Sequence, residues 1–261
     1  MMRRMLLLPC LLSLLWSPLL LAAPVAKPVE WRIGGDTFAG VLVYDDAVKQ
    51  PRPGLVMVPN WKGVNESAIE KARLVAGDDY VVLVADVFGK SIRPKTDAEA
   101  GPVATAMRAD RPRLRARVQK AVEVLKQQPG TLVDAARIGA FGYCFGGSTV
   151  LELVRAGDAL SGVVSLHGGL ATDLPAAGPV KSPVLVLNGG DDSYVSAAEI
   201  TAFQDEMRKA GADWQFVSFG GAVHCFAESD AQNPPGCLYH APSAKRAYRM
   251  MADFFRDVFA R

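Results

Sequence analysis

Residues 137–154 read RIGAFGYCFGGSTVLELV, and this stretch decides the fold. Residues 137–141 form a short apolar run that indicates a strand, and residues 150–154 form a second run that suits a helix. Between them, residues 142–146 match the G-x-C-x-G pattern of a sharp strand-to-helix turn. Glycines allow close backbone approach there, so the pattern predicts that the Cys144 side chain projects above the end of a sheet.

A thiol at such a turn is suited to nucleophilic catalysis. The N–H groups and the dipole at the start of the following helix favour a thiolate over a neutral thiol. The alternative is a buried cysteine that only packs beneath a helix. Because the strand, turn and helix patterns agree around Cys144, we predict that it is the nucleophile.

A thiol nucleophile needs a base, and the base needs an acid that orients it. His224 follows the last expected strand, residues 214–219, which suits the base in the chain order nucleophile, acid, base. His167 ends the strand after the turn helix and could line the pocket, but it precedes every good acid candidate. His240 lies in a polar segment that suits a surface or packing role.

The acid is expected in the loop that follows the strand at residues 183–187. This loop contains Asp191 and Asp192 next to each other. Either aspartate could orient His224, and either could instead shape the turn. The residues alone leave both open.

Short apolar runs alternate with helical patterns along the rest of the chain. Helix starts are expected at Asn65, Asp110, Ser196 and Ser243. Two runs split by Gly34-Gly35 predict an N-terminal hairpin. This alternation predicts an α/β fold with a mostly parallel central sheet, helices on both faces and an N-terminal β-hairpin. Strands are expected at residues 54–59, 80–85, 137–141, 162–166, 183–187 and 214–219.

Residues 1–23 have the pattern of a secretory signal peptide. Arg3 and Arg4 precede a Leu-rich run that ends at Ala22-Ala23, and the cleavage site is expected within about residues 22–26. The alternative is a retained membrane anchor, which two prolines in the run disfavour. We therefore expect an exported protein, in the periplasm or outside the cell, with no membrane contact after cleavage.

Composition excludes several classes of protein. Half of the 261 residues are hydrophobic, which excludes a disordered chain. The net charge is +2, and no basic tract interleaved with aromatics occurs, so a nucleic-acid partner is not expected. Composition does not indicate an oligomeric state.

The chain resembles the dienelactone hydrolase family, a cysteine branch of the α/β-hydrolase fold, over about residues 31–259, which we expect to form one domain. The resemblance rests on residues 142–147, 189–195 and 222–226. It implies Cys144 as nucleophile, His224 as base and Asp192, rather than Asp191, as the acid. It further implies an oxyanion hole made by the backbone N–H groups of Trp61 and Phe145.

Three positions depart from the family pattern. Asn60 stands where the family has a carboxylate that helps to activate the cysteine, Lys90 replaces one arginine, and Glu228 replaces another. The paired-arginine clamp for a carboxylate substrate is therefore not intact. We expect a pocket for neutral esters or lactones. Its candidate lining is Trp61, Phe145, Asn60, Phe88, Lys90, Tyr143, Tyr194 and Glu228.

After removal of the signal, three cysteines remain. In an oxidising compartment, we expect Cys225 and Cys237 to form a disulfide that holds the loop of His224. The alternatives are two free thiols, or a pairing of Cys225 with Cys144 that would block the nucleophile. No metal ligand set and no organic cofactor is expected.

The function that these predictions favour is hydrolysis of a small carboxylic ester or lactone through an acyl-enzyme. The competing hypothesis is a non-catalytic ligand-binding or redox-responsive protein on the same fold, because a fold alone does not establish activity. Asn60 and Glu228 are the residues that favour this alternative.

Overall fold

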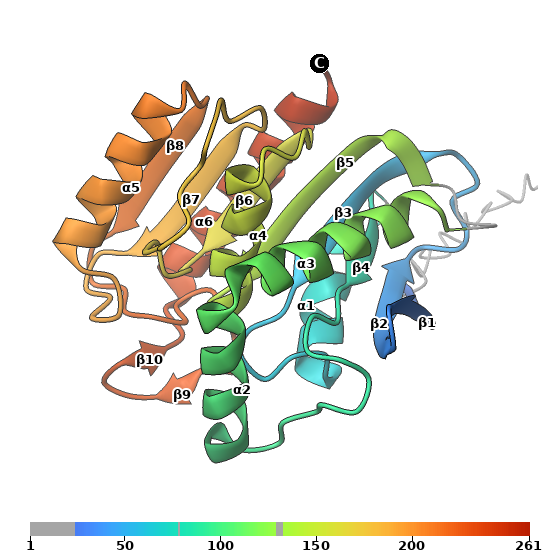
Figure 1. Ribbon diagram of the computed structural model, residues 1–261, viewed down its shortest axis with the longest axis horizontal. Helices are drawn as coiled ribbons and strands as arrows, with labels where there is room; N and C mark the ends of the chain where they lie inside the picture. Colours follow the sequence, from blue (N-terminus) through green and yellow to red (C-terminus); the bar gives the residue numbers. More distant parts are fainter. Residues whose placement is uncertain (1–23, 78, 129–132) are drawn as a thin grey trace, which may run out of the picture.

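The main sheet has eight strands in the order β1-β2-β4-β3-β5-β6-β7-β8 (Figure 1). The computed structural model describes residues 24–77, 79–128 and 133–261, so the predicted signal peptide lies outside the described residues. Pairing is antiparallel between β1 and β2 and between β2 and β4, and parallel across the remaining pairs. The strands are β1 (Val25–Ile33), β2 (Asp36–Tyr44), β3 (Arg52–Val58), β4 (Val81–Val84), β5 (Val133–Tyr143), β6 (Gly162–Leu166), β7 (Val184–Gly189) and β8 (Trp214–Phe219).

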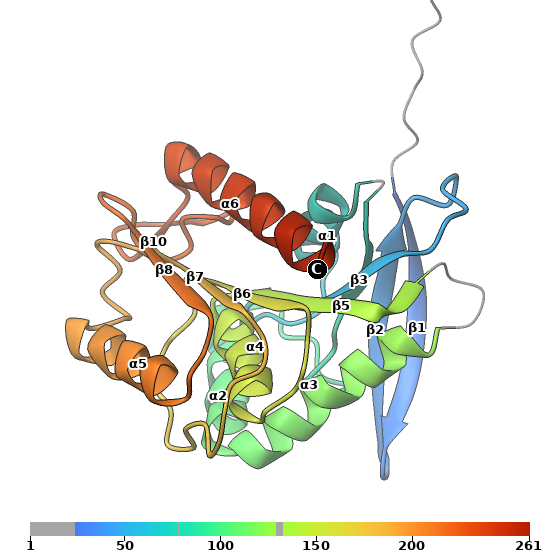
Figure 2. The same ribbon diagram turned by 90° about the horizontal axis from the view of Figure 1, so that it is seen from above.

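Helices cover both faces of this sheet (Figure 2). One face carries α1 and α6, and the other carries α2, α3, α4 and α5, and a separate apolar core fills each side. Both the mostly parallel sheet and the N-terminal hairpin were predicted, and the structure confirms them. The helices are α1 (Glu66–Ala76), α2 (Asp97–Ala109), α3 (Arg111–Lys126), α4 (Phe145–Arg155), α5 (Ala197–Lys209) and α6 (Ala241–Phe259).

Three predicted helix starts are confirmed, and the fourth is wrong. The side chains of Asn65, Asp110 and Ser196 each accept a hydrogen bond from the first turn of their helix. The last helix does not begin at Ser243. His240 is its N-cap residue, and Pro242 lies in its first turn, where the missing N–H of proline costs nothing. The Ser243 hydroxyl bonds the His240 ring instead, at 2.8 Å.

Two elements were not predicted. Helix α2 contains Pro102, which favours a break, but Thr96 and Glu99 form a capping box that starts the helix. A short hairpin of β9 (Gln232–Asn233) and β10 (Cys237–Leu238) lies between β8 and α6. It borders the loop that carries His224, so it bears on the candidate site.

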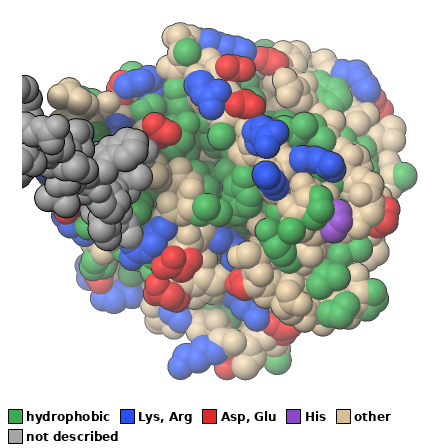
Figure 3. Space-filling model, turned by 180° about the vertical axis from the view of Figure 1, so that it is seen from behind, with side chains coloured by type: hydrophobic (Ala, Val, Ile, Leu, Met, Phe, Trp, Pro, Cys, Tyr) green, Lys and Arg blue, Asp and Glu red, His purple; other side chains and the backbone are tan. Residues whose placement is uncertain are grey.

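The face made by α1 and α6 has a hollow of about 810 Å³ in which hydrophobic side chains gather beside lysines and arginines (Figure 3). Leu74, Tyr80 and Phe259 are among its lining residues, and Cys144 and His224 are not. Within the described ranges, no helix is both long enough and apolar enough to cross a bilayer.

Candidate functional site

Cys144 lies between the end of β5 and the start of α4, at the sharp turn that the sequence predicts. Its backbone has φ 52° and ψ −115°, a left-handed conformation that non-glycine residues rarely adopt. Two glycines make the turn possible. A Cβ on Gly142 would lie 2.3 Å from the Gly146 carbonyl, and one on Gly146 would lie 1.9 Å from the Val58 oxygen. The thiol of Cys144 is free and half-buried at the N-terminus of α4.

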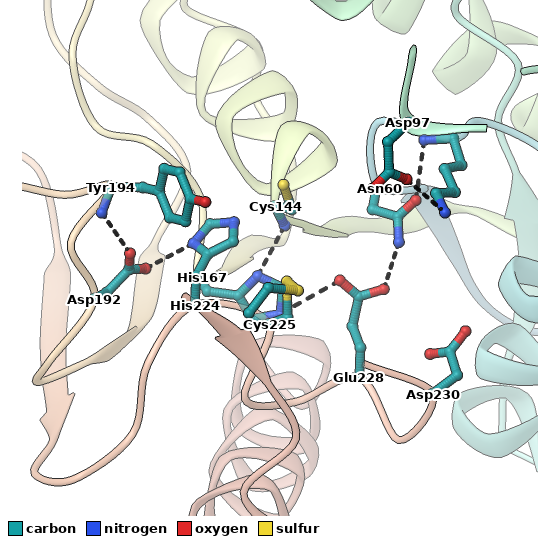
Figure 4. The surroundings of a disulfide bond; sticks show 12 residues. Asn60, Asp97, Cys144, His167, Asp192, Tyr194, His224, Cys225, Glu228 and Asp230 are labelled. Atoms are coloured by element: carbon teal, nitrogen blue, oxygen red, sulfur yellow. Dashed lines mark hydrogen bonds and ion pairs between the residues drawn. A yellow bond between two sulfur atoms is a disulfide. The ribbon is translucent and has the colours of Figure 1, made fainter. Parts of the chain in front are cut away.

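His224 and Asp192 form a buried pair beside this thiol (Figure 4). His224 Nδ1 lies 2.7 Å from Asp192 Oδ2, and the other Asp192 oxygen accepts a hydrogen bond from the Tyr194 backbone N–H at 2.9 Å. Asp191 is exposed. Its N–H bonds the Ala222 carbonyl, which joins the loops of Asp192 and His224.

The charge of His224 depends on its neighbours. Burial lowers its pKa, but the interactions with Asp192 and with Cys144 outweigh burial and raise the pKa to about 10. An imidazolium at this place is therefore stable at neutral pH when it faces a thiolate and a carboxylate. The exposed ring of Tyr194 packs edge-on against the His224 ring, with ring centres 4.9 Å apart.

The two candidate oxyanion donors come from different elements. Phe145 N–H is the first amide of α4, and Trp61 N–H lies in the loop after β3. In the described part of the chain, neither amide donates a hydrogen bond to another protein group. Asn60 shapes the Trp61 loop, because its side-chain oxygen accepts from the Lys62 N–H at 3.1 Å and its carbonyl accepts from Gly63.

Glu228 lies in a buried polar cluster rather than at an open pocket wall. Its Oε2 accepts from Asn60 Nδ2 at 2.6 Å and lies 3.4 Å from Lys71 Nζ. Burial raises the pKa of Glu228, while Lys71 and Asn60 act in the opposite direction. Lys71 also pairs with Asp230 at 2.6 Å. Neither Lys71 nor Asp230 was identified from the sequence, although a lysine among the alanines of the α1 apolar face is a usable signal.

A disulfide joins Cys225 to Cys237, as the sequence analysis favoured, with 5.0 Å between their Cα atoms. It connects the residue after His224 to β10. The Leu238 N–H also donates to the His224 carbonyl at 3.0 Å. The alternative pairing with Cys144 is not formed, so the thiol remains available.

Three further predicted pocket residues make contacts with other protein side chains. Tyr143 is fully buried, and its hydroxyl bonds that of Tyr248 at 2.8 Å. Phe88 is buried against the Phe145 ring. Lys90 pairs with Glu30 at 2.7 Å.

Phe88 and Lys90 do line a cavity of about 910 Å³ between the β1–β2 turn and α2, whose lining does not include Cys144 or His224. The described residues contain no group of three or more metal-ligating side chains.

Known proteins are similar to this chain in architecture and in sequence. The model of the dienelactone hydrolase family matches residues 38–259. A solved structure named m3DLH is 34% identical, with a TM-score of 0.86, over 91% of this chain and 100% of that chain. The crystal structure of P91, a dienelactone hydrolase-like promiscuous phosphotriesterase from metagenomic libraries, is 34% identical, with a TM-score of 0.85, over 91% of this chain and 99% of its own.

A curated relative also matches part of the chain. The Caenorhabditis elegans protein K02A2.1 is 33% identical over 153 residues, which are 57% of this chain and 96% of that protein.

Proposed function

Because this chain belongs to the dienelactone hydrolase family, we propose that it is an exported hydrolase that cleaves small neutral carboxylic esters or lactones through Cys144, His224 and Asp192. Family membership itself makes the chain an ester or lactone hydrolase. The observation that supports the three residues is their arrangement: a free thiol at a strand-to-helix turn beside a buried His224–Asp192 pair.

The proposed reaction begins with the Cys144 thiolate and the His224 imidazolium. The thiolate attacks the carbonyl carbon, and the carbonyl electrons move to the oxygen, which the N–H groups of Trp61 and Phe145 stabilise. When the tetrahedral intermediate collapses, the ester C–O bond breaks and His224 gives its proton to the leaving alkoxide. The product is an alcohol and a thioester on Cys144.

Water then releases the acyl group. Neutral His224 takes a proton from water as the oxygen attacks the thioester carbon, and the thiolate leaves as the carboxylic acid forms. The acid loses its proton to the solvent, and the pair of thiolate and imidazolium is restored. Asp192 keeps the His224 ring oriented, because its carboxylate bonds the ring nitrogen that does not face the substrate.

Removal of the thiol tests this mechanism. With p-nitrophenyl acetate and the chain without its predicted signal, Cys144→Ala should lower kcat by at least about a thousandfold. Its circular dichroism spectrum should match the wild type. Acid-quenched wild type should carry one acetyl group on Cys144 by mass spectrometry. Wild-type turnover by Cys144→Ala would overturn the mechanism, and inactivity of the wild type on every ester, lactone and phosphotriester in a panel would favour the non-catalytic alternative.

The preference for neutral substrates follows from the charges near the site. Of the two positions where the resemblance places a cationic clamp, one holds the anion Glu228 and the other holds Lys90, which pairs with Glu30. Glu228 is held by Asn60 and Lys71, so neither position supplies an unpaired cation that would bind a substrate carboxylate. The test compares kcat/KM for a matched diester and its mono-acid, and we expect the neutral member to be preferred by about tenfold or more. Preference for the anion would reject this part of the proposal.

Export is supported by the predicted signal at residues 1–23 and by the disulfide, since such bonds persist in oxidising compartments. Expression of the full chain in a bacterium with a secretion pathway, followed by fractionation and N-terminal sequencing, tests it. We expect the protein outside the cytoplasm with a new N-terminus within about residues 22–26. An intact N-terminus on cytoplasmic protein would contradict export.

A further inference from the structure

His167 contacts the nucleophile turn from beneath. It follows β6, is fully buried, and has φ 40°. Its Nδ1 accepts a hydrogen bond from the Cys144 backbone N–H at 3.1 Å, and that N–H is shared with the Leu166 carbonyl at 3.0 Å. An imidazole that accepts through Nδ1 carries its proton on Nε2 when it is neutral. Burial and the nearby charge of His224 lower the pKa of His167, so the ring stays neutral.

The proton on His167 Nε2 faces Glu228. Nε2 is buried without a hydrogen-bond partner in the described residues, and Glu228 Oε1 lies 3.9 Å from it. The rings of Tyr143, His224 and Phe226 pack around His167, with ring centres 6.0, 5.1 and 5.5 Å away. This packing fixes the direction in which the ring presents Nε2.

Glu228 therefore faces two different donors, one with each oxygen. Oε1 faces His167, which bonds the residue before Phe145, and Oε2 accepts from Asn60, the residue before Trp61. Through His167 and Asn60, Glu228 is thus linked to the residue that precedes each candidate oxyanion donor. Figure 4 shows Glu228 between Asn60 and the ring of His167, below Cys144.

We propose that Glu228 is a positioning residue that sets the two oxyanion donors, Phe145 through His167 and Trp61 through Asn60. This inference rests on the proposed role of Cys144. Glu228 acts through other side chains and does not contact the substrate. A carboxylate suits the place, because each of its oxygens can accept from the N–H group that it faces, whereas a glutamine amide would turn its NH₂ group toward one of the two donors.

Two reactions of the Cys144 thiol, ester hydrolysis and alkylation, distinguish an effect on the oxyanion donors from an effect on the reactivity of the thiol itself. Ester cleavage develops an oxyanion, but alkylation by iodoacetamide is a displacement at a saturated carbon and develops none at this place. Glu228→Gln should therefore lower kcat for p-nitrophenyl acetate by about 10- to 100-fold, the range for a weakened oxyanion donor, with KM little changed. The rate of Cys144 alkylation should stay within about twofold of the wild type.

Asp230→Asn is the matched control, because Asp230 also pairs with Lys71 but contacts neither donor loop. It should keep both rates within about twofold. Equal kcat in Glu228→Gln and Asp230→Asn would overturn the proposal, and so would an equal loss of hydrolysis and alkylation in Glu228→Gln. Failure of the proposed function is distinguished by the Cys144→Ala variant, which would then still hydrolyse the ester.

Three further substitutions keep the proposal testable if Glu228→Gln does not fold. Asn60→Ala removes only the link from Glu228 to the Trp61 loop. It should lower kcat for the ester while the rate of Cys144 alkylation stays unchanged. His167→Asn keeps an acceptor for the Cys144 N–H, so it should retain more ester activity than His167→Leu. Unchanged hydrolysis in Asn60→Ala would overturn the proposed link to Trp61. Equal activities in the two His167 variants would overturn the proposed link to Phe145.

Discussion

Single residues decide the chemistry, and the clearest contrast is between the two adjacent aspartates. Asp192 is buried and bonds His224, while Asp191 is exposed. Asp192→Asn should lower kcat/KM by about 10²- to 10⁴-fold, since the His224 ring loses its orienting anion. Asp191→Asn should change it by less than about threefold. Steady-state kinetics on both variants provides the measurement, and a larger loss at Asp191 would place the acid one residue earlier.

The raised pKa of His224 predicts a pH dependence with a definite sign. The imidazolium persists up to a pH of about 10 and is lost above it. Because that proton goes to the leaving group, kcat/KM for an alkyl ester should fall as pH rises through this range. A p-nitrophenyl ester, whose leaving group needs no proton, should fall much less. Profiles for the two esters measured in parallel test the assignment, and identical profiles would contradict it.

At the scale of elements, the turn from β5 to α4 depends on close contact with the end of β3. A Cβ on Gly146 would lie 1.9 Å from the Val58 oxygen, so Gly146→Ala must displace α4 or β3. We expect a loss of stability of about 1–3 kcal/mol or more, together with loss of hydrolysis. Gly178→Ala is the control, because a Cβ added at Gly178 would meet no other atom within 4 Å. Thermal unfolding and activity assays of both variants provide the comparison.

Local patterns explain why much of the fold could be predicted. The strand, turn and helix around Cys144 depend on neighbouring glycines and apolar runs, so they are visible in the sequence. Helix α2 was not predicted. Its Pro102 disfavours a helix locally, although Thr96 and Glu99 form a capping box at its start. Ser243 was given the role that belongs to His240.

The polar cluster could not be predicted in the same way. Asn60 and Glu228 are 168 positions apart, and Lys71 and Asp230 are 159 apart. No periodicity or local motif relates residues at such separations, and only the packed sheet brings them together. From the sequence, Asn60 and Glu228 could each be identified as a departure from the family pattern, but not as hydrogen-bonded partners.

At the scale of the whole molecule, a buried ionic network joins three helices on one face of the sheet. Glu152 of α4 is fully buried and accepts from Arg111 and Arg115 of α3, at 3.0 and 2.8 Å, and from Arg155 at 3.1 Å. Arg155 in turn pairs with Glu206 of α5. The network therefore fastens α3, α4 and α5 to one another.

Removal of Glu152 should weaken the whole fold. Glu152→Ala leaves buried guanidinium groups without their shared carboxylate, and we expect a loss of about 3–5 kcal/mol in urea denaturation. Glu123→Ala, which breaks an exposed pair with Lys120, should change stability by less than about 1 kcal/mol. Equal effects of the two variants would show that the network does not stabilise the fold.

The disulfide makes a second contribution at this scale. The double variant Cys225→Ser/Cys237→Ser should lose about 2–4 kcal/mol of stability and part of its activity, because the loop of His224 is no longer held to β10. Dithiothreitol should reproduce the loss in the wild type and have no effect on the double variant. A wild type indifferent to dithiothreitol would contradict this role.

Cysteine pairing also has a practical consequence. The sequence has four cysteines, of which Cys10 would leave with the signal peptide and two are bonded to each other. After the proposed cleavage, the chain would hold one free thiol, that of Cys144, the proposed nucleophile. A maleimide dye added in substoichiometric steps would therefore titrate the concentration of active enzyme in a purified preparation, with no engineered cysteine.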